Sequence, residues 1–525
     1  MTNKVQPTEL KQWLSDGNEI ALLDVREHGP YGDGHPFFAI PAAYSGFEAR
    51  VADIAPNKTV RMVLYDKDDG LAELAAERAQ ALGYTNISIM AGGAPAWGAA
   101  GFTLYEGVNL PSKTFGELLE IERHTPRKSP AEVAAMAKDN ANHVIVDGRP
   151  WAEYTKFNIP GGICCPNGEL PLRIKEIVPD PETTIIVNCA GRTRSILGAQ
   201  TLIDMGVPNP VYALENGTQG WFLEGLDREE GADRSYPDAP KSDAELEALR
   251  AKAKARADAT GVRSTTVDQA ATWLADTGRT TYLFDVRTHE EFAANGVVGS
   301  RHAPGGQLVQ ATDQWVGVRG ARIIVMDDDM IRAPMVANWL HQLGHDVVVL
   351  EGGIEAARGM SVPALAPFVP AELQAMSPAD FKAQAGVVQL IDLRTAMTYR
   401  AGHIDGARWS IRPRLDRLEL ETGSSVVLIA NDSNTAALAA QRLGELGHTD
   451  IRQLSGDAKT WQAAGLNIVA TSSDPPDAEC IDFLFHTHQR NDGDRTAAEA
   501  YIAWEIGLVD QLDEQEKASF QLAAE

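Results

Sequence analysis

The stretch Ile186–Val207, IVNCAGRTRSILGAQTLIDMGV, decides the fold of this chain. An apolar run comes first, then a short polar loop, then an apolar period typical of a helix, which predicts a buried strand, a loop and a helix. The same order recurs in three other segments: 63–84, 324–345 and 428–448. The residue that opens the loop differs between the copies: Asp66, Cys189, Asp327 and Ala430.

An Asp-x-Arg signature ends another apolar run upstream of each copy. Its four aspartates are Asp24, Asp147, Asp285 and Asp392. The loop opens 42 residues after this aspartate in the first three copies and 38 residues after it in the fourth. A glycine-containing turn closes each copy, with the sequences MAGGAPAW, LENGTQGW, LEGGIEAA and LSGDAKTW. Four ordered copies indicate a chain built from one repeated structural unit.

The repeated unit predicts the fold class. Strands that alternate with helices over roughly one hundred residues are typical of βαβ units around a parallel sheet. We therefore expect four tandem α/β domains, each a doubly wound, mainly parallel sheet with helices on both faces. Ligand sites of such sheets lie at the carboxyl ends of strands. The loop that Cys189 opens lies at one of those ends.

Composition and repeat spacing divide the chain into domains. The four predicted domains are 1–110, 125–235, 262–365 and 372–470. The charged, alanine-rich run within 236–261 predicts a helical linker. The remaining 471–525 is a C-terminal extension whose WEIGLVDQL run predicts a helix. We expect two tandem pairs, the first domain with the second and the third with the fourth.

The overall charge limits the classes of partner. The 525 residues carry a formal net charge of −26, which repels nucleic acid and anionic membranes. Neither a signal peptide nor a long apolar span is evident, so a cytoplasmic location is expected. The four cysteines, Cys164, Cys165, Cys189 and Cys480, are too few and too scattered for a disulfide framework. We expect no cofactor and no metal, although His486 and His488 alternate in the extension.

The Asp-x-Arg signature, the strand–loop–helix unit and the closing glycine turn together resemble the rhodanese family. The resemblance implies a sulfurtransferase with a six-residue active loop that begins at its nucleophile, Cys189. The loop residues that it implies for substrate binding are Ala190, Gly191, Arg192, Thr193 and Arg194, with Ser195 opening the helix. The other three copies lack the cysteine. The resemblance also implies an active pocket in the cleft between an inactive first domain and an active second one.

The residues of the loop themselves indicate anion chemistry. A cysteine before the first turn of a helix meets unpaired N–H groups and the positive end of the helix dipole, which favour its thiolate. Arg192 and Arg194 add two positive charges, and Gly191 lets the backbone curl into an anion-binding nest. Such a nest suits a persulfide and an anionic donor such as thiosulfate. Sulfane sulfur would then pass to cyanide or a thiol.

Two neighbouring groups have expected roles of their own. Asp147 and Arg149 are expected to brace the domain, with Arg149 paired to Glu153. The vicinal cysteines Cys164 and Cys165 leave open a resolving role through a disulfide to Cys189.

Alternative functions remain at this point. Cysteine-dependent phosphatases and arsenate reductases use Cys-x5-Arg, whereas the interval from Cys189 to Arg194 is Cys-x4-Arg, which favours a sulfur-sized centre. The noncatalytic copies also fit a binding scaffold, and the sequence leaves a homo-oligomer open. If these copies only bind partners, a chain ending near residue 235 keeps sulfur transfer.

Overall fold

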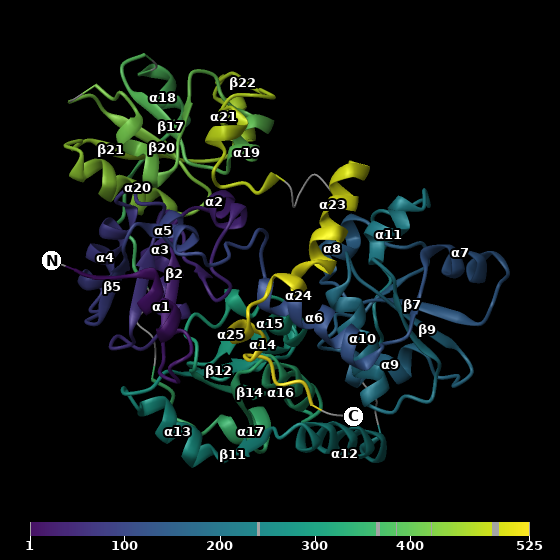
Figure 1. Ribbon diagram of the computed structural model, residues 1–525. Helices are drawn as coiled ribbons and strands as arrows, with labels where there is room; N and C mark the ends of the chain where they lie inside the picture. The colour runs from purple at the N-terminus through teal and green to yellow at the C-terminus, as the bar shows by residue number, and fades with distance from the viewer. Residues whose placement is uncertain are drawn as a thin grey trace.

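The computed structural model describes residues 2–238, 242–363, 368–384, 386–421, 423–485 and 493–523. Its described part contains four five-stranded sheets whose strands all pair in parallel (Figure 1). Each sheet has the same order: the first strand of the repeat lies beside the last, and the Asp-x-Arg strand lies next to the far edge. The predicted fold class is therefore confirmed.

The first two repeats have matching elements. In repeat 1 the sheet order is β1 (Asn3–Val5), β5 (Ile87–Met90), β4 (Met62–Tyr65), β2 (Ala21–Asp24) and β3 (Ile40–Pro41), with helices α1 (Pro7–Trp13), α2 (His28–Asp33), α3 (Phe47–Ile54), α4 (Leu71–Ala81) and α5 (Gly93–Ala99). In repeat 2 it is β6 (Arg127–Lys128), β10 (Val211–Leu214), β9 (Thr184–Asn188), β7 (His143–Asp147) and β8 (Ile163–Cys164), with helices α7 (Pro130–Lys138), α8 (Trp151–Lys156), α9 (Leu170–Ile177), α10 (Thr193–Asp204) and α11 (Gly217–Leu223).

The last two repeats follow the same plan. Repeat 3 has β11 (Arg263–Thr265), β15 (Asp346–Leu350), β14 (Arg322–Met326), β12 (Thr281–Asp285) and β13 (Arg301–His302), with α13 (Val267–Ala275), α14 (His289–Asn295), α15 (Gly305–Gln310), η2 (Thr312–Gln314), α16 (Arg332–Gln342) and α17 (Gly353–Ala357). Repeat 4 has β16 (Gln374–Met376), β21 (Ile451–Leu454), β20 (Val426–Ile429), β17 (Gln389–Asp392) and β19 (Arg408–Trp409), with α18 (Pro378–Ala383), α19 (Ala396–Ala401), η3 (Arg412–Arg417), α20 (Ser433–Glu445) and α21 (Ala458–Ala463). A small antiparallel pair, β18 (His403–Ile404) and β22 (Ile468–Val469), closes repeat 4.

Each sheet is buried on both faces, which explains why its strands are continuous apolar runs. Along β4, Met62 and Leu64 enter one hydrophobic cluster while Val63 and Tyr65 enter another. Because successive side chains of a strand point to opposite faces, the two clusters lie on opposite sides of the sheet.

The repeats do not pack as the two tandem pairs that the sequence suggested. Repeat 2 packs against repeat 3, through α10 and α9 on one side and α15 and α16 on the other. Repeat 1 packs against repeat 4 through η1 (Tyr44–Gly46), which meets η3 and α20. A buried ion pair of 2.6 Å between Glu48 and Arg412 joins these two repeats. Repeat 1 also shares a hydrophobic cluster with repeat 3.

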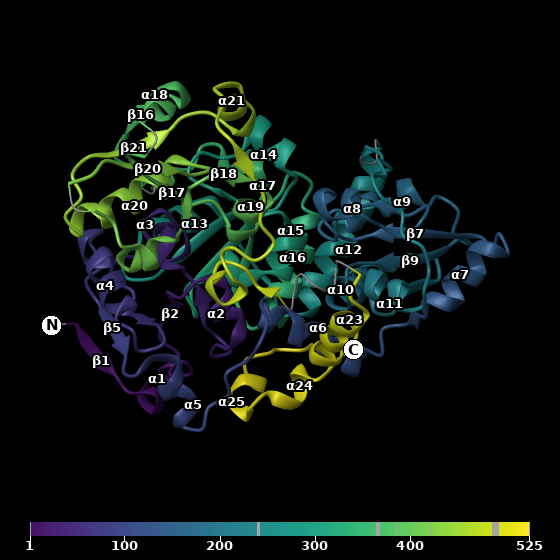
Figure 2. The same ribbon diagram turned by 90° about the horizontal axis from the view of Figure 1, so that it is seen from above.

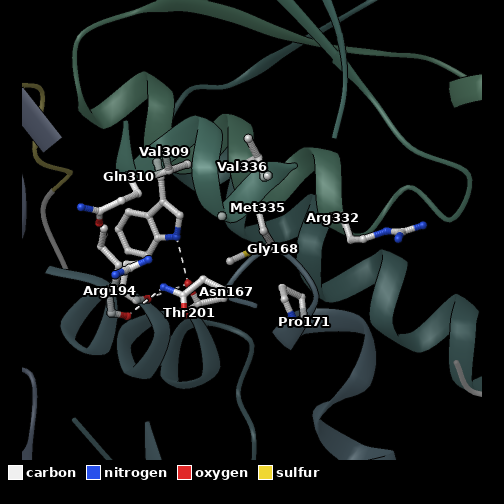
Figure 3. A pocket seen from close by; sticks show the side chains of 14 residues that line it. Asn167, Gly168, Pro171, Arg194, Thr201, Val309, Gln310, Arg332, Met335 and Val336 are labelled. Atoms are coloured by element: carbon white, nitrogen blue, oxygen red, sulfur yellow. Dashed lines mark hydrogen bonds between the residues drawn. The ribbon is translucent and has the colours of Figure 1, made fainter. Parts of the chain in front are cut away.

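The boundary between repeats 2 and 3 is tightly packed (Figure 3). Trp339 donates an indole hydrogen bond of 2.9 Å to Thr201 across it. The backbones approach so closely at Gly168 and Gly306 that a Cβ on Gly168 would lie 2.7 Å from the nitrogen of Gly306. The space left there is about 20 Å³, room for one water and no substrate.

Helices outside the repeats connect them. The helix predicted in the linker is α12 (Asp243–Ala259), and a buried helix, α6 (Leu110–Arg123), lies between repeats 1 and 2. The extension forms α23 (Arg495–Ile506), α24 (Leu508–Gln511) and α25 (Glu514–Lys517), so the helix predicted from WEIGLVDQL is interrupted at Gly507. Figure 1 shows the last part of this extension, from α23 to α25 and coloured yellow, beginning beside repeat 2. Seen from above, it lies along the outside of α6 (Figure 2).

The extension binds all four repeats. One hydrogen-bonded or ion-paired contact to each repeat, in order from repeat 1 to repeat 4, is Glu516 with Lys11, Glu505 with Thr193, Gln521 with Gln342, and Asp482 with Ala396.

Candidate active site

Cys189 follows the last residue of β9, at the carboxyl end of the sheet. Its side chain is only 1% exposed, but it borders a cavity of about 470 Å³. Ligand pockets of proteins have volumes of about 300–1,000 Å³, so this cavity is large enough for a small-molecule substrate. Ala190, Gly191 and the rest of the loop to Arg194 also border it.

The strand end that carries Cys189 is held by the Asp-x-Arg pair. Arg149 binds both carboxylate oxygens of Asp147, at 2.7 Å for the closest pair, and donates to the carbonyl of Phe157. Asn188 donates to the same carboxylate at 2.9 Å. The equivalent arginine and aspartate pair in all four repeats. The sequence did not single out Asn188, whose only signal was its position directly before the cysteine.

The closing glycine turn supports the loop from the other side. Thr218 and Gln219 donate their N–H groups to the carbonyls of Cys189 and Ala190, at 2.8 and 3.1 Å. A Cβ on Gly217 would lie 2.3 Å from the carbonyl oxygen of Cys189, and its φ of +53° is one that side chains rarely adopt. The glycine of this signature is therefore required by its contact with the active loop.

Arg192 does not act as an unpaired charge beside the cysteine. Its guanidinium binds both carboxylate oxygens of Glu117 on α6, at 2.7 and 2.8 Å, and also contacts Glu120. A further hydrogen bond of 3.0 Å reaches Asn216 in the closing turn. Arg192 borders the cavity, but its strongest contacts fasten the loop to α6.

Arg194 is also paired, with the residue that the sequence assigned to Arg149. Both of its terminal nitrogens lie 2.8 Å from the carboxylate of Glu153. The expected pair of Arg149 with Glu153 is therefore wrong, because Arg149 is already held by Asp147. The pKa of Arg194 lies above its usual value. Burial lowers this pKa, but the attraction of Glu153 and of the nearby Cys189 raises it by more, so the guanidinium stays charged. The two positive charges predicted beside Cys189 are each offset by a carboxylate.

The hydroxyl groups of the loop are engaged in protein contacts. Thr193 donates to Glu505 of α23 at 3.0 Å, and Ser195 donates to the carbonyl of Arg192 at 2.8 Å. Gly191 lies so close to the same helix that a Cβ there would be 2.9 Å from a carboxylate oxygen of Glu505. The extension therefore packs directly on the active loop.

The cavity beside Cys189 is walled by repeat 3 and the extension. Besides the loop and α8, its lining includes Gly107 and Lys113 near α6, Gln307, Gln310 and Gln314 of repeat 3, and Tyr501 and Trp504 of α23. None of the lining residues belongs to the sheet or helices of repeat 1. The expected cleft between the first two domains is therefore wrong: the segment 1–110 contributes only its end, at Gly107, Val108 and Asn109, and the larger contribution, Gln307, Gln310, Ala311 and Gln314, comes from repeat 3.

The other cysteines lie in less reactive surroundings. Burial raises the pKa of Cys164 to about 12 and that of Cys165 well above its usual value. Cys165 is a core residue of repeat 2. Burial also raises the pKa of Cys480 in the extension. These thiols stay protonated at neutral pH, which argues against a resolving role for the vicinal pair.

Aspartates take the position of Cys189 in repeats 1 and 3, and their carboxylates accept hydrogen bonds from the backbone N–H groups of their own loops. In repeat 3 the Asp327 carboxylate accepts the N–H groups of Met330, Ile331 and Arg332, at 3.0, 3.1 and 2.9 Å. In repeat 1 the Asp66 carboxylate accepts those of Asp68 and Ala72, at 2.8 and 3.0 Å. A carboxylate of the protein thus fills the nest in both loops that open with aspartate.

No helix in the part of the chain that the structure describes is both long and apolar enough to cross a bilayer. No group of three or more potential metal ligands occurs among those residues. His486 and His488 lie outside the described residues.

Comparisons with known proteins agree with this architecture. The rhodanese-like domain family matches residues 6–100, 129–224, 266–359 and 371–464. A crystal structure of thiosulfate sulfurtransferase from Pseudomonas aeruginosa is 39% identical, with a TM-score of 0.90 and 99% of each chain covered.

Two curated relatives each match one repeat-sized segment. The uncharacterized protein YqhL of Bacillus subtilis is 33% identical over 91 residues, 17% of this chain and 72% of that protein. The HTH-type transcriptional regulator Rv0324 of Mycobacterium tuberculosis is 33% identical over 94 residues, which are 18% of this chain and 41% of the regulator. The family matches cover most of the chain. This chain therefore belongs to the rhodanese family, with four rhodanese-like domains in tandem.

Proposed function

We propose that this chain is a sulfurtransferase that moves sulfane sulfur from thiosulfate, or a related donor, to cyanide or a thiol through a persulfide on Cys189. The observation that carries the proposal is the contrast between loops. Where repeat 3 fills its N–H groups with the Asp327 carboxylate, the equivalent N–H groups of repeat 2 belong to Arg192, Thr193 and Arg194, and a cysteine takes the aspartate's position.

That contrast explains how the loop stabilises its charged states. A thiolate or persulfide carries one negative charge, as the carboxylate does in repeat 3. Backbone N–H groups at the start of α10, together with the helix dipole, stabilise a negative charge at this position. No side chain caps the start of α10. The donors are therefore available to the sulfur of Cys189.

The chemical steps balance without a cofactor. The Cys189 thiolate attacks the outer sulfur of thiosulfate, a new S–S bond forms, and the S–S bond of thiosulfate breaks to release sulfite with the electron pair. The thiolate of the acceptor, or cyanide, then attacks the outer sulfur of the persulfide. That bond breaks toward Cys189, which returns as a thiolate and leaves an acceptor persulfide or thiocyanate.

Repeat 3 and α23 contribute to the proposed site by enclosing it. Outside the loop, the lining includes Gln307, Gln310 and Gln314 of repeat 3 together with Tyr501 and Trp504 of α23. These amide and aromatic groups would contact an acceptor larger than cyanide. The proposal therefore assigns repeat 3 and the extension to the active site, in addition to any role in binding partners.

The test measures sulfur on the protein and its fate. Purified full-length chain is treated with thiosulfate, and its intact mass is expected to rise by a single sulfur that cyanide removes. Parallel assays with mercaptopyruvate, a glutathione persulfide and p-nitrophenyl phosphate compare the donor classes and the phosphatase alternative. Hydrolysis of the phosphate ester without sulfur loading would contradict the proposal.

A further inference from the structure

Repeats 1 and 4 enclose a second cavity, of about 370 Å³, in the position that corresponds to the catalytic one. It borders Arg26 of the Asp-x-Arg pair and the loop that Asp66 opens, as the catalytic cavity borders Arg149 and the loop of Cys189. The extension reaches this cavity too, through Ile481. Each of the two packed pairs of repeats thus has a cavity beside the loop that Asp66 or Cys189 opens.

The partner repeats line the two cavities with equivalent positions of different chemistry. In repeat 3, Gln307 and Gln310 lie 22 and 25 residues after the Asp-x-Arg aspartate, and both border the catalytic cavity. In repeat 4, Arg414 and Arg417 lie 22 and 25 residues after theirs, and both border the second cavity. Two neutral amides have been exchanged for two guanidinium groups.

Basic residues outnumber acidic ones around the second cavity. The basic residues are Arg26, Lys67, Arg414, Arg417 and Arg442, and the acidic ones are Glu27, Asp69 and Asp416. Burial raises the pKa of Glu27 to about 7, which reduces its negative charge at neutral pH. A basic cavity of this kind is notable on a chain whose net charge is −26.

The cations differ in how far they are already paired. Arg26 is held by Asp24, Arg414 by Glu479, and Arg442 approaches Glu445 at 3.4 Å. Arg417 is exposed and has no ion pair with another described residue. Burial lowers the pKa of Arg414, and the nearby Arg417 lowers it further because like charges repel. An anion between these two groups would relieve that repulsion.

We infer that the cavity between repeats 1 and 4 binds a small polyanion that carries phosphate or carboxylate groups, and does no sulfur chemistry on it. The loop, Asp66 to Gly70, has no thiol to carry sulfur, and the Asp66 carboxylate already accepts the N–H groups of Asp68 and Ala72. The ligand is therefore held by side-chain guanidinium and ammonium groups. A volume of about 370 Å³ admits a metabolite-sized ion.

The experiment is calorimetric titration of the full chain at low ionic strength with two probes, inorganic pyrophosphate and citrate. At least one probe is expected to bind with one site per chain, and added salt should weaken it. Pyrophosphate binding alone would assign a phosphorylated ligand, and citrate binding alone a polycarboxylate. Binding of neither probe would overturn the inference.

Substitutions locate the binding in this cavity. Arg417→Gln introduces the residue that repeat 3 has at the same position, and it should weaken binding about tenfold or more, because a hydrogen bond to a charged group is lost. Arg414→Gln is a second variant with the same expectation. Arg358→Gln, an exposed arginine of repeat 3, is the matched control and should bind as the unmodified chain does.

Sulfur transfer separates this inference from the proposed function. The Arg417→Gln variant should retain thiosulfate turnover, since Arg417 does not border the catalytic cavity. Conversely, Cys189→Ser should still bind the anion. Anion binding that survives both arginine substitutions would contradict the inference whatever the sulfur assay gives.

Discussion

The loops of repeats 2 and 3 have the same frame and differ at the one residue that matters for chemistry. Arg194 lies five residues after Cys189 and binds Glu153, and Arg332 lies five residues after Asp327 and binds Glu291 at 2.7 Å. Both glutamates lie six residues after their Asp-x-Arg aspartate. This arginine–glutamate pair therefore does not by itself mark a catalytic loop.

The difference lies in what occupies the nest of N–H groups. Asp327 supplies a fully buried carboxyl group that accepts the N–H groups of its own loop, so that loop is complete without a ligand. Cys189 supplies a thiol that acquires charge only when it ionises or carries sulfur. Under the proposed function, the exchange of aspartate for cysteine separates a structural loop from a loop that holds a transferable sulfur atom.

The largest effect is expected from Cys189→Ser. The variant should show no added sulfur after thiosulfate treatment and no transfer to cyanide, because none of the other loops opens with a thiol. Intact-protein mass spectrometry and a thiocyanate assay measure the two properties. Two or more cyanide-labile sulfurs on the unmodified chain would break the comparison between loops.

Cysteine labelling tests whether the chemistry is confined to the loop. With a pKa of about 12, Cys164 is ionised in only about one molecule in ten thousand at pH 8. Iodoacetamide should therefore modify Cys189 first and leave Cys164 and Cys165 unmodified until the protein unfolds. Peptide mapping after timed alkylation gives the order, and early labelling of the vicinal pair would restore the resolving role.

The next effect concerns Arg194→Ala. The substitution leaves the Glu153 carboxylate near Cys189 without its guanidinium partner, and a like charge opposes an incoming dianion. We expect kcat/KM for thiosulfate to fall tenfold or more. The matched variant is Arg332→Ala, which should lower the melting temperature without a comparable loss of kcat/KM per folded molecule.

Trp504→Ala tests the wall that the extension contributes. The indole borders the catalytic cavity and lies against Gly107. Its removal should raise the KM for a thiol acceptor several-fold while turnover with cyanide, which is too small to reach that wall, stays nearly unchanged. Trp13→Ala in repeat 1 serves as the control, and equal effects on both acceptors would show that α23 acts only through stability.

The smallest effect is expected from Glu153→Gln. Loss of this carboxylate leaves the positive charge of Arg194 uncompensated, so KM for thiosulfate should fall modestly, by about two- to fivefold, a difference of up to about 1 kcal/mol. Glu291→Gln removes the equivalent carboxylate of repeat 3 and should leave KM unchanged. A higher KM in Glu153→Gln would mean that Arg194 needs its partner to keep its position.

Much of this protein followed from its sequence. The four repeats, their parallel sheets and the isolated cysteine were predicted because apolar period, turn glycines and motif spacing are local properties of the chain. The sequence could also have predicted that Gly217 packs on the backbone of Cys189. Gly93 and Gly353 pack in the same way on Asp66 and Asp327. In the sequence, this contact was indicated by a glycine at the same position of the closing turn in three repeats.

Only the tertiary structure decided which surfaces meet. Arg192 finds its carboxylate 75 residues upstream, at Glu117, and Thr193 finds its partner 312 residues downstream, at Glu505. A helical apolar period predicts that one face of a helix is buried. Four similar repeats have similar apolar faces, so the pattern does not predict which repeat packs against which. For this reason the pairing of repeat 2 with repeat 3, and the wall that the extension adds, emerge only when the chain is folded.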